Sequence, residues 1–362
     1  MALDRAFWEG RRVLLTGHTG FKGTWLLLLL ERLGAEVTGL SLDPPTAPAM
    51  FEMVGGASRC RHLVGDIRDL AAVRTAVDAA RPQVILHLAA QPLVRRSYDD
   101  PLETYSTNVM GTANVLEAAR AAHGLRAVVS VTTDKCYEND GRTEGYREDA
   151  RLGGHDPYSN SKACAELVSQ SFRDSFYACR RIGLATARAG NVIGGGDYAA
   201  NRLVPDCARA FGEGRTLELR NPAAVRPWQH VLEPIVGYLT LAQQLEREPE
   251  RFAGGWNFGP AAADLAPVSQ VVELAAKSWD VSGGWTAQPG EHPHEAAMLT
   301  LDSARAMRDL GWQPALSLAE AVGWSADWFR SVDGGADAAE LTGRQIDGYL
   351  ARISPTRSRA AA

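Results

Sequence analysis

The sequence is short of lysine. Only four of its 38 basic residues are lysines, and the others are arginines. A lysine is therefore weak evidence that a place needs an amine, either as a compact charge or as a group that can lose its proton. The four are Lys22, Lys135, Lys162 and Lys277.

Long apolar runs and paired cysteines are also missing. The longest apolar run, Trp25 to Leu30, is far shorter than the roughly 20 residues that cross a bilayer. Met1 to Arg12 is charged and has no apolar core, so we expect no secretory signal. The five cysteines are an odd number without a Cys-x-x-Cys pair. We therefore expect a soluble, cytoplasmic protein with free thiols.

Length and charge restrict the class of protein further. The chain has 362 residues, 45% of them hydrophobic and 22% charged, which predicts one large globular unit or two closely packed ones. A net charge of −5 argues against a protein that mainly neutralises nucleic-acid phosphates. We expect neither nucleic acid nor a membrane as a partner.

The first half alternates short apolar runs with helical patterns. This alternation predicts an α/β fold with a Rossmann-type doubly wound parallel sheet. The expected helices cover Gly23 to Leu33, Leu70 to Ala80, Leu102 to Ala122, Tyr158 to Tyr177 and Val231 to Glu246. The expected strands are Val13 to Thr16, Glu36 to Ser41, Arg61 to Val64, Val84 to Leu88, Ala127 to Thr132 and Leu184 to Arg188.

After Arg188 the regular alternation fades into glycine, proline and tryptophan. We expect a dinucleotide-binding domain over residues 1–188 with a returning segment near 229–255. Residues 189–228 and 256–350 are expected to form a smaller, discontinuous α/β substrate-binding lobe. Residues 351–362 are expected to be a flexible tail.

A glycine-rich loop follows the first strand. Gly17, Gly20 and Gly23 permit a tight turn, a close approach to a pyrophosphate and a helix lying close on its strand. The spacing is GxxGxxG rather than GxGxxG, so a plain tight turn before a helix is the alternative.

A carboxylate follows each of the next two expected strands. Asp43 is placed to bind both ribose hydroxyls and to repel a 2′-phosphate, which favours NAD over NADP, although an Asp-Pro-Pro turn is the alternative. Asp66 and Ile67 follow the third strand, where they could contact an adenine ring.

Tyr158 and Lys162 are four residues apart and so share one face of a helix. A nearby ammonium favours the phenolate and lowers the pKa of the tyrosine. Such a pair can deprotonate an alcohol as its hydride leaves, although helical Tyr and Lys at this spacing also occur by chance.

Together these motifs resemble the extended short-chain dehydrogenase/reductase superfamily, and most closely its nucleotide-sugar 4,6-dehydratases. The resemblance covers nearly the whole chain and is greatest to the subgroup that acts on CDP-glucose. It rests on Gly17 to Gly23, His87 to Gln91, Asn108 to Thr112, Thr133 to Tyr137, Tyr158 to Lys162, Arg188 to Asp197 and Arg226 to Val231.

The resemblance implies a closed redox cycle on one sugar. Tyr158, assisted by Lys162 and Thr133, would take the C4 hydroxyl proton while hydride passes to NAD⁺. Asp134 would protonate the departing C6 hydroxyl, and hydride would return to C6. The product would be a 4-keto-6-deoxy sugar. The strand end that carries Thr133 and Asp134 is where open α/β sheets place their ligands.

Lys135 stands where dTDP-glucose enzymes have glutamate, the expected C5 base. Either Lys135 is desolvated enough to act as a base, or it stabilises an enolate while another group moves the proton. The sequence leaves both open.

The resemblance also implies the binding residues. For NAD they are Gly17, Thr19, Gly20, Phe21, Lys22, Gly23, Asp43, Asp66, Ile67, Leu88, Ala89, Ala90, Thr107, Tyr158 and Lys162. For the nucleotide sugar they are Gln91, Asn191, Arg202, Arg226 and His294. Because Pro293 breaks the Glu291 to Glu295 segment, we expect a sugar-nucleotide loop there rather than a metal site.

Other readings remain. The chain could be an NAD-dependent nucleotide-sugar 4-epimerase, which would need no acid at C6, or a dehydratase of another nucleotide hexose. A dinucleotide sensor without activity could discard Tyr158 and Lys162. The resemblance implies that the helices expected over Leu102 to Ala122 and Tyr158 to Tyr177 pair across a two-fold axis in a homodimer or a dimer of dimers.

Overall fold

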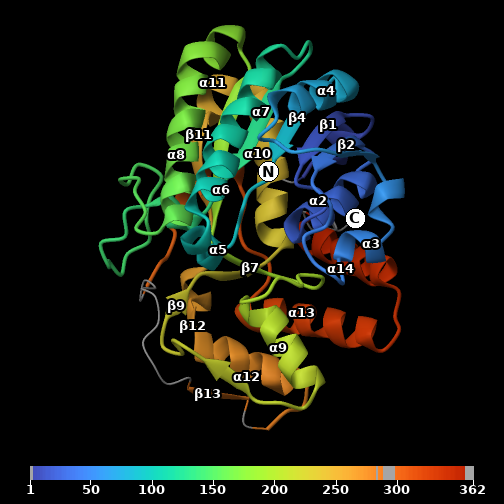
Figure 1. Ribbon diagram of the computed structural model, residues 1–362, viewed down its shortest axis with the longest axis vertical. Helices are drawn as coiled ribbons and strands as arrows, with labels where there is room; N and C mark the ends of the chain where they lie inside the picture. The colour runs from blue at the N-terminus through green and yellow to red at the C-terminus, as the bar shows by residue number, and fades with distance from the viewer. Residues whose placement is uncertain (1–2, 283, 288–297, 355–362) are drawn as a thin grey trace, which may run out of the picture.

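A seven-stranded parallel sheet forms the centre of the computed structural model, which describes residues 3–282, 284–287 and 298–354 (Figure 1). Its order is β11-β6-β5-β4-β1-β2-β3. The strands are β1 (Arg12–Thr16), β2 (Glu36–Ser41), β3 (Arg61–Val64), β4 (Val84–His87), β5 (Ala127–Val131), β6 (Gly183–Ala189) and β11 (Gly254–Phe258). The doubly wound α/β fold is confirmed, together with the six expected strands.

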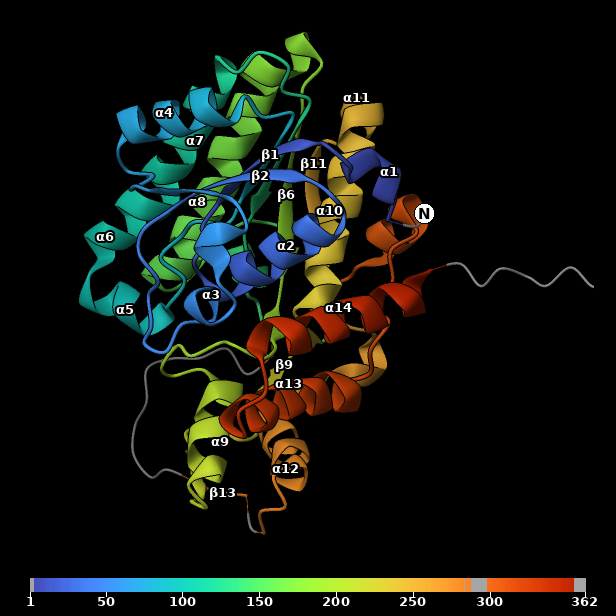
Figure 2. The ribbon, with the colours of Figure 1, turned by 90° about the vertical axis from the view of Figure 1, so that its right-hand side faces the viewer.

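Helices cover both faces of this sheet (Figure 2). Successive strand residues point to opposite faces, so Leu14 and Val128 pack on one side while Val13 and Val129 pack on the other. The first side is covered by α4 (Leu70–Ala80), α7 (Gly111–Arg120) and α8 (Pro157–Phe172), and the second by α2 (Phe21–Arg32) and α10 (Leu232–Arg247).

Two expected helices contain wider turns. The helix expected from Leu102 to Ala122 is divided into α6 (Pro101–Tyr105), the π-helical turn η2 (Ser106–Met110) and α7. The helix that carries Tyr158 ends in a second π-helical turn, η4 (Arg173–Tyr177). Asp156 caps the N-terminus of α8 by accepting a hydrogen bond from the Ser159 amide at 2.9 Å.

The second lobe lies beyond the carboxyl edge of the sheet (Figure 1). It contains α9 (Leu203–Gly212), α12 (Val268–Ser278) and α13 (Leu318–Asp333). Three small pairs of strands accompany them: β7 (Asn191–Ile193) with β10 (Trp228–His230), β8 (Leu217–Leu219) with β13 (Trp285–Ala287), and β9 (Val225–Arg226) with β12 (Ala266–Pro267).

The chain returns to the sheet twice after this lobe begins. Strand β11 pairs with β6 and ends at Phe258, beyond the expected boundary at 255. Helix α14 (Ala338–Ile353) packs against α2, where Arg32 pairs with Asp347. The tail expected from residue 351 is wrong for 351–353, which belong to α14. Residues 355–362 lie outside the described part.

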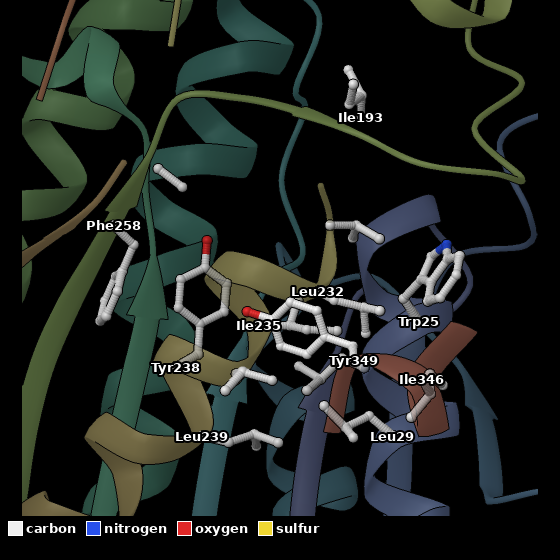
Figure 3. Packing of buried hydrophobic residues seen from close by; sticks show 14 of the residues in the cluster. Trp25, Leu29, Ile193, Leu232, Ile235, Tyr238, Leu239, Phe258, Ile346 and Tyr349 are labelled. Atoms are coloured by element: carbon white, nitrogen blue, oxygen red, sulfur yellow. The ribbon is translucent and has the colours of Figure 1, made fainter. Parts of the chain in front are cut away.

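Aromatic residues from α2, α10 and α14 fill the core behind the sheet (Figure 3). The indole of Trp25 donates to the Gly195 carbonyl at 2.9 Å, and the Tyr349 hydroxyl donates to Glu233 at 2.5 Å. These contacts tie the second lobe and α14 to the sheet. In the described part of the chain, we find no helix that could span a membrane.

The remaining described elements are short. They are α1 (Arg5–Trp8), α3 (Met50–Met53), η1 (Gly56–Ser58), α5 (Val94–Asp99), η3 (Asp134–Cys136), η5 (Ala178–Arg180), α11 (Pro249–Phe252), η6 (Ala262–Asp264) and η7 (Ala306–Leu310).

Candidate active site

One cavity of about 2210 Å³ runs along the carboxyl ends of the strands and into the second lobe. Every expected site residue that the structure describes lines it. The residues expected to act in catalysis, to bind NAD and to bind the nucleotide sugar therefore line the same cavity. Open α/β sheets bind their ligands at this edge. His294 lies outside the described residues. The roles of the individual residues stay predictions.

The glycine loop leaves space at the N-terminus of α2. Gly17 has a φ of +78°, and a Cβ there would lie 2.7 Å from the Ala89 nitrogen. A Cβ on Gly23 would lie 2.0 Å from the Gly17 oxygen, so both positions need glycine for the protein's own packing. At Gly20 the nearest atom would be 3.5 Å away. The loop thus leaves the helix N-terminus open to the cavity, which fits a pyrophosphate.

The ends of β2 and β3 form the far side of this space. Asp43 is exposed and lines the cavity. The Asp66 carboxylate accepts hydrogen bonds from the backbone and the guanidinium of Arg68, each at 2.8 Å. Partial burial raises the pKa of Asp66, but these hydrogen bonds lower it more, so that this pKa is below its usual value. Ile67 is buried against Gly111.

Thr133, Asp134 and Lys135 follow β5 directly. The Thr133 hydroxyl donates to Asp134 Oδ1 at 2.9 Å and accepts from the Lys135 amide at 3.3 Å. Asp134 is buried, and among the described residues its Oδ2 has no hydrogen-bond partner. Lys135 is half-buried and lines the same cavity. One carboxylate oxygen is therefore held by the protein while the other is available to a ligand.

Tyr158 and Lys162 face this strand end from the first turns of α8. The Lys162 ammonium donates to the Val131 carbonyl at 3.2 Å. Burial lowers the pKa of Lys162 to about 8, against the opposing charge of Glu166. Burial also raises the pKa of Tyr158 to about 12, against the opposing effects of the Thr133 side chain and the charge of Arg202.

This result corrects one expectation. We expected the Lys162 ammonium to lower the pKa of Tyr158, but burial outweighs the nearby cations. The groups that lower this pKa are Thr133 and Arg202, and Arg202 comes from the second lobe.

A buried ion pair beneath the site was not foreseen. Glu166 pairs with Arg188 at 2.8 Å and also accepts hydrogen bonds from Thr132 and Thr186, each at 2.5 Å. Arg188 donates to the Tyr137 hydroxyl at 2.6 Å. The sequence feature that could have indicated this ion pair is the position of Glu166, which lies four residues after Lys162 and so on the same helix face.

The residues expected to bind the nucleotide sugar lie in different surroundings. Arg202 pairs with Asp197 at 2.8 Å, and its charge lowers the pKa of both Tyr158 and Lys22. Arg226 is buried and donates to the Val225 carbonyl at 2.9 Å. Asn191 lies on β7 and lines the cavity.

Gln91 is held by the protein. Its side-chain amide donates to Thr104 at 2.9 Å and to the Leu93 carbonyl at 3.1 Å, and its oxygen accepts from the Leu93 amide. Asn108, in the π-helical turn η2, bonds to the Gln91 backbone and to Ser161 on α8. Gln91 and Asn108 thereby fix the wall of the cavity beside α8.

Lys22 lies in the first turn of α2 beside the catalytic residues. Burial, with the charges of Arg202 and Lys162, lowers its pKa to about 7. Its ammonium lies 5.9 Å from the ring centre of Tyr238 on α10. Several cations thus converge on one end of the cavity, where they suit an anionic ligand.

Comparisons with known proteins show the family of the chain. A family model described as GDP-mannose 4,6 dehydratase matches residues 14–323. A CDP-glucose 4,6-dehydratase of Salmonella typhimurium is 46% identical, over 96% of this chain and 98% of its own length. A dTDP-glucose 4,6-dehydratase of Streptomyces griseus is 30% identical, over 88% and 93% of the two chains.

Solved structures show the same fold. A dTDP-glucose 4,6-dehydratase from Streptomyces venezuelae, solved with NAD bound, superposes with a TM-score of 0.75 at 25% identity, over 89% of this chain and 98% of that one. A UDP-glucose 4-epimerase from Thermotoga maritima superposes with a TM-score of 0.77 at 20% identity, over 88% and 99%. From the family model and the near full-length relatives, the chain belongs to the GDP-mannose 4,6 dehydratase family of the extended short-chain dehydrogenase/reductase superfamily.

Proposed function

We propose that the protein is a CDP-glucose 4,6-dehydratase, a hydro-lyase that converts CDP-D-glucose to CDP-4-keto-6-deoxy-D-glucose and water with the help of bound NAD. The observation that carries this is the pairing of two kinds of proton-transfer group in one cavity: Tyr158 with Lys162, and Asp134 after β5. A 4-epimerase has no use for an acid at C6. The near full-length relative with this activity supports the choice of nucleotide.

The cofactor fits the sheet half of the cavity. The loop from Gly17 to Gly23 and the N-terminus of α2 would hold the pyrophosphate, and Asp43 would bind the ribose. Bound NAD supplies a temporary acceptor for the hydride that leaves C4 and returns at C6. Asp66, Ile67, Leu88, Ala89, Ala90 and Thr107 line the same half.

The chain's own residues move the protons. Tyr158 takes the proton of the C4 hydroxyl, and the Thr133 side chain and the charge of Arg202, which both lower its pKa, favour the phenolate that this requires. The resulting ketone makes the C5 proton acidic. Asp134 then protonates the departing C6 hydroxyl, which leaves as water. Lys135 acts near C5, either as the base or as a charge that stabilises the enolate.

The second lobe supplies the nucleotide contacts. Arg226, Arg202 and Asn191 would bind the diphosphate and sugar from the lobe side of the cavity, since a guanidinium can bind two phosphate oxygens at once. Residues 1–188 with the returning segment would then serve NAD, and 189–228 with 256–350 the nucleotide sugar.

The molecule would act as a dimer in the cytoplasm. Leu102 on α6, Met110 in η2 and Leu167 on α8 are 79%, 57% and 53% exposed, and these three elements contact one another. A second copy packed on α6, α7 and α8 would cover them. The five unpaired cysteines suit a reducing compartment.

Proton NMR tests the reaction directly. CDP-, dTDP-, UDP- and GDP-linked glucose are each incubated with the protein and NAD⁺, and a new C6 methyl signal is sought. We expect it with CDP-glucose alone. A methyl signal with another nucleotide would change the substrate, whereas inversion at C4 without a methyl signal would make the protein an epimerase.

A further inference from the structure

A second cavity, of about 410 Å³, lies away from the active site. Its lining includes three arginines: Arg74 on α4, Arg120 at the end of α7 and Arg180 at the end of η5. The other described residues that line it are Glu117, Ala121, Ser175, Phe176 and Cys179. Three cations against one carboxylate give this lining a net positive charge, in a chain whose own net charge is −5.

The second cavity is separate from the place proposed for the reaction. Helix α8 begins beside Tyr158 and continues through η4 to Phe176, which is 18 residues later or about 27 Å along a helix. In Figure 1, α7 and α8 run from the edge of the sheet that faces the second lobe toward the opposite edge. Among the described residues, none lines both cavities. A ligand bound here would therefore not overlap NAD or the nucleotide sugar.

Two of the three arginines are held in place by the protein. The Arg120 guanidinium donates to Glu117 at 2.6 Å and lies 4.0 Å from the ring centre of Phe176. Arg180 donates to the main-chain carbonyl of Arg120, the last residue of α7. A guanidinium has five N–H donors, so these contacts leave most of the donors free for a ligand. Side chains fixed in this way lose less conformational entropy on binding than free surface arginines do.

Further positive charge at this edge of the sheet is not neutralised. Arg74 is exposed, and its side chain has no hydrogen bond or ion pair with any described residue. The same is true of Arg126 and Arg181, which precede the neighbouring strands β5 and β6. Glu117, the carboxylate of the lining, is already paired with Arg120. The field at this end of the molecule therefore favours a ligand with several negative charges.

We propose that this cavity is a second anion site, which binds a small molecule with a chain of two or three phosphate groups. Guanidinium groups suit such a chain because each can bind two phosphate oxygens through charge-assisted hydrogen bonds. The volume lies within the range of about 300–1000 Å³ that is typical of small-molecule sites. A chain of phosphates offers oxygens to all three arginines, which a single phosphate does not. The proposal goes beyond the dehydratase reaction and does not depend on it.

The shape of the site favours a small molecule over an anionic membrane or a nucleic acid. Those partners present extended rows of phosphate and need a broad basic face. Here the arginines surround a hollow between α4, α7 and the η4–η5 segment, and Glu117 at its wall would repel an extended row of phosphates.

The binding test uses the full-length protein saturated with NAD⁺ and CDP, so that the cations of the active site are occupied. Titration calorimetry with sodium tripolyphosphate should show one site per chain. We expect Arg74→Gln with Arg180→Gln to weaken this binding about tenfold or more, because two charged donors are lost. Arg209→Gln with Arg344→Gln removes two charges on α9 and α14 instead, and should change the affinity less than about twofold.

Cys179 reports where the anion binds. It is exposed and lines the second cavity, whereas Cys164 is half-buried on α8 and lines neither cavity. We expect tripolyphosphate to slow alkylation of Cys179 by iodoacetamide about fivefold or more, because a bound anion covers the thiol and disfavours its thiolate. The rate at Cys164, measured by the same peptide mass spectrometry, should stay unchanged. This readout needs no variant, so it holds even if the arginine variants do not fold.

CTP in place of tripolyphosphate distinguishes the source of the phosphate chain. Tighter binding of CTP identifies a nucleotide and equal binding an inorganic chain, and both results support the site. Absence of binding at millimolar concentration, equal weakening by the two pairs of variants, displacement by further CDP, or an unprotected Cys179 would each overturn it. Phosphatidylglycerol vesicles that bind where tripolyphosphate does not would replace it with a membrane contact. Absence of a methyl product would remove the proposed function and leave this site standing.

Discussion

The guanidinium of Arg188 lies 2.8 Å from the carboxylate of Glu166, and the exposed fractions of the two side chains are only 5% and 3%. Burial raises the pKa of Glu166, but the charge and hydrogen bond of Arg188 keep this pKa below its usual value. The pair joins β6 to α8, and the bond from Thr132 adds the end of β5. The buried charge pair thus fixes β6 to the helix that carries Tyr158 and Lys162, and the Thr132 hydrogen bond attaches the strand end that precedes Thr133 and Asp134.

Removing one partner should be costly. We expect Glu166→Ala to lower the free energy of unfolding by about 3–5 kcal/mol, because the Arg188 charge would remain buried without its partner. Urea denaturation followed by circular dichroism measures the change.

Glu246 provides a matched control for that experiment. It pairs with Arg11 at 3.0 Å, but near the surface, where the exposed fractions of the two side chains are 22% and 17%. Glu246→Ala should lower the free energy of unfolding by about 1 kcal/mol or less. Equal losses in the two variants would contradict a special role for the buried pair.

Loss of the Tyr158 hydroxyl should stop the chemistry and leave the fold intact. We expect Tyr158→Phe to lower kcat about 10²- to 10⁴-fold, since its hydroxyl is the group proposed to take the C4 proton. The rate of methyl-signal growth in the NMR assay gives the measurement.

Tyr105→Phe is the control for that variant. It loses one hydrogen bond, from the Tyr105 hydroxyl to Asn160 at 2.9 Å, and Tyr105 does not line the cavity. Its activity should stay within a few-fold of the unmodified protein. Full activity in Tyr158→Phe would refute the assignment of the base.

Most of the sheet could be predicted from the sequence because its strands are continuous apolar runs. Strand β11 was missed, since it begins with Gly254 and Gly255 and carries no such run. Its place is set by pairing with β6, a contact between segments far apart in the chain. The π-helical turn at 106–110 was missed for a related reason, because it keeps the apolar spacing of a helix while widening one turn.

The residues of the site, like the strands, could be predicted from the sequence only in part. Residues that directly follow strands β1 to β5 could be assigned to one cavity, because the carboxyl ends of parallel strands share an edge. Arg202 could be assigned only through the family resemblance, because its position depends on how α9 packs against α12 and α13 in the second lobe. The environment of Tyr158 was misjudged, since a helix pattern shows which residues share a face and not how deeply they are buried.

The exposed apolar side chains on α6, η2 and α8 should hold two copies together. We expect the protein to sediment as a dimer at micromolar concentration, and Met110→Asp with Leu167→Asp to yield a monomer, because two charges would have to be buried at the contact. Met307→Asp is the control, since Met307 is 41% exposed but lies in η7, away from these helices. A monomeric unmodified protein would overturn the proposed dimer.

The acid limb of the pH profile should depend on Arg202. Tyr158 accepts a proton only when ionised, so kcat/KM rises with pH as the phenol loses its proton. Because the Arg202 charge lowers the pKa of Tyr158, Arg202→Met should raise that pKa and move the limb by about 1 pH unit to higher pH. The loss of activity should then be larger at pH 7 than at pH 9.

Arg209→Met separates this effect from a general loss of positive charge on α9. Arg209 lies on the same helix, pairs with Asp206 and does not line the cavity. We expect its profile to coincide with that of the unmodified protein. If Arg202→Met instead raised KM equally at every pH and left the limb in place, Arg202 would act only by binding the nucleotide sugar. A shifted limb requires its charge to act on the phenol that removes the C4 proton.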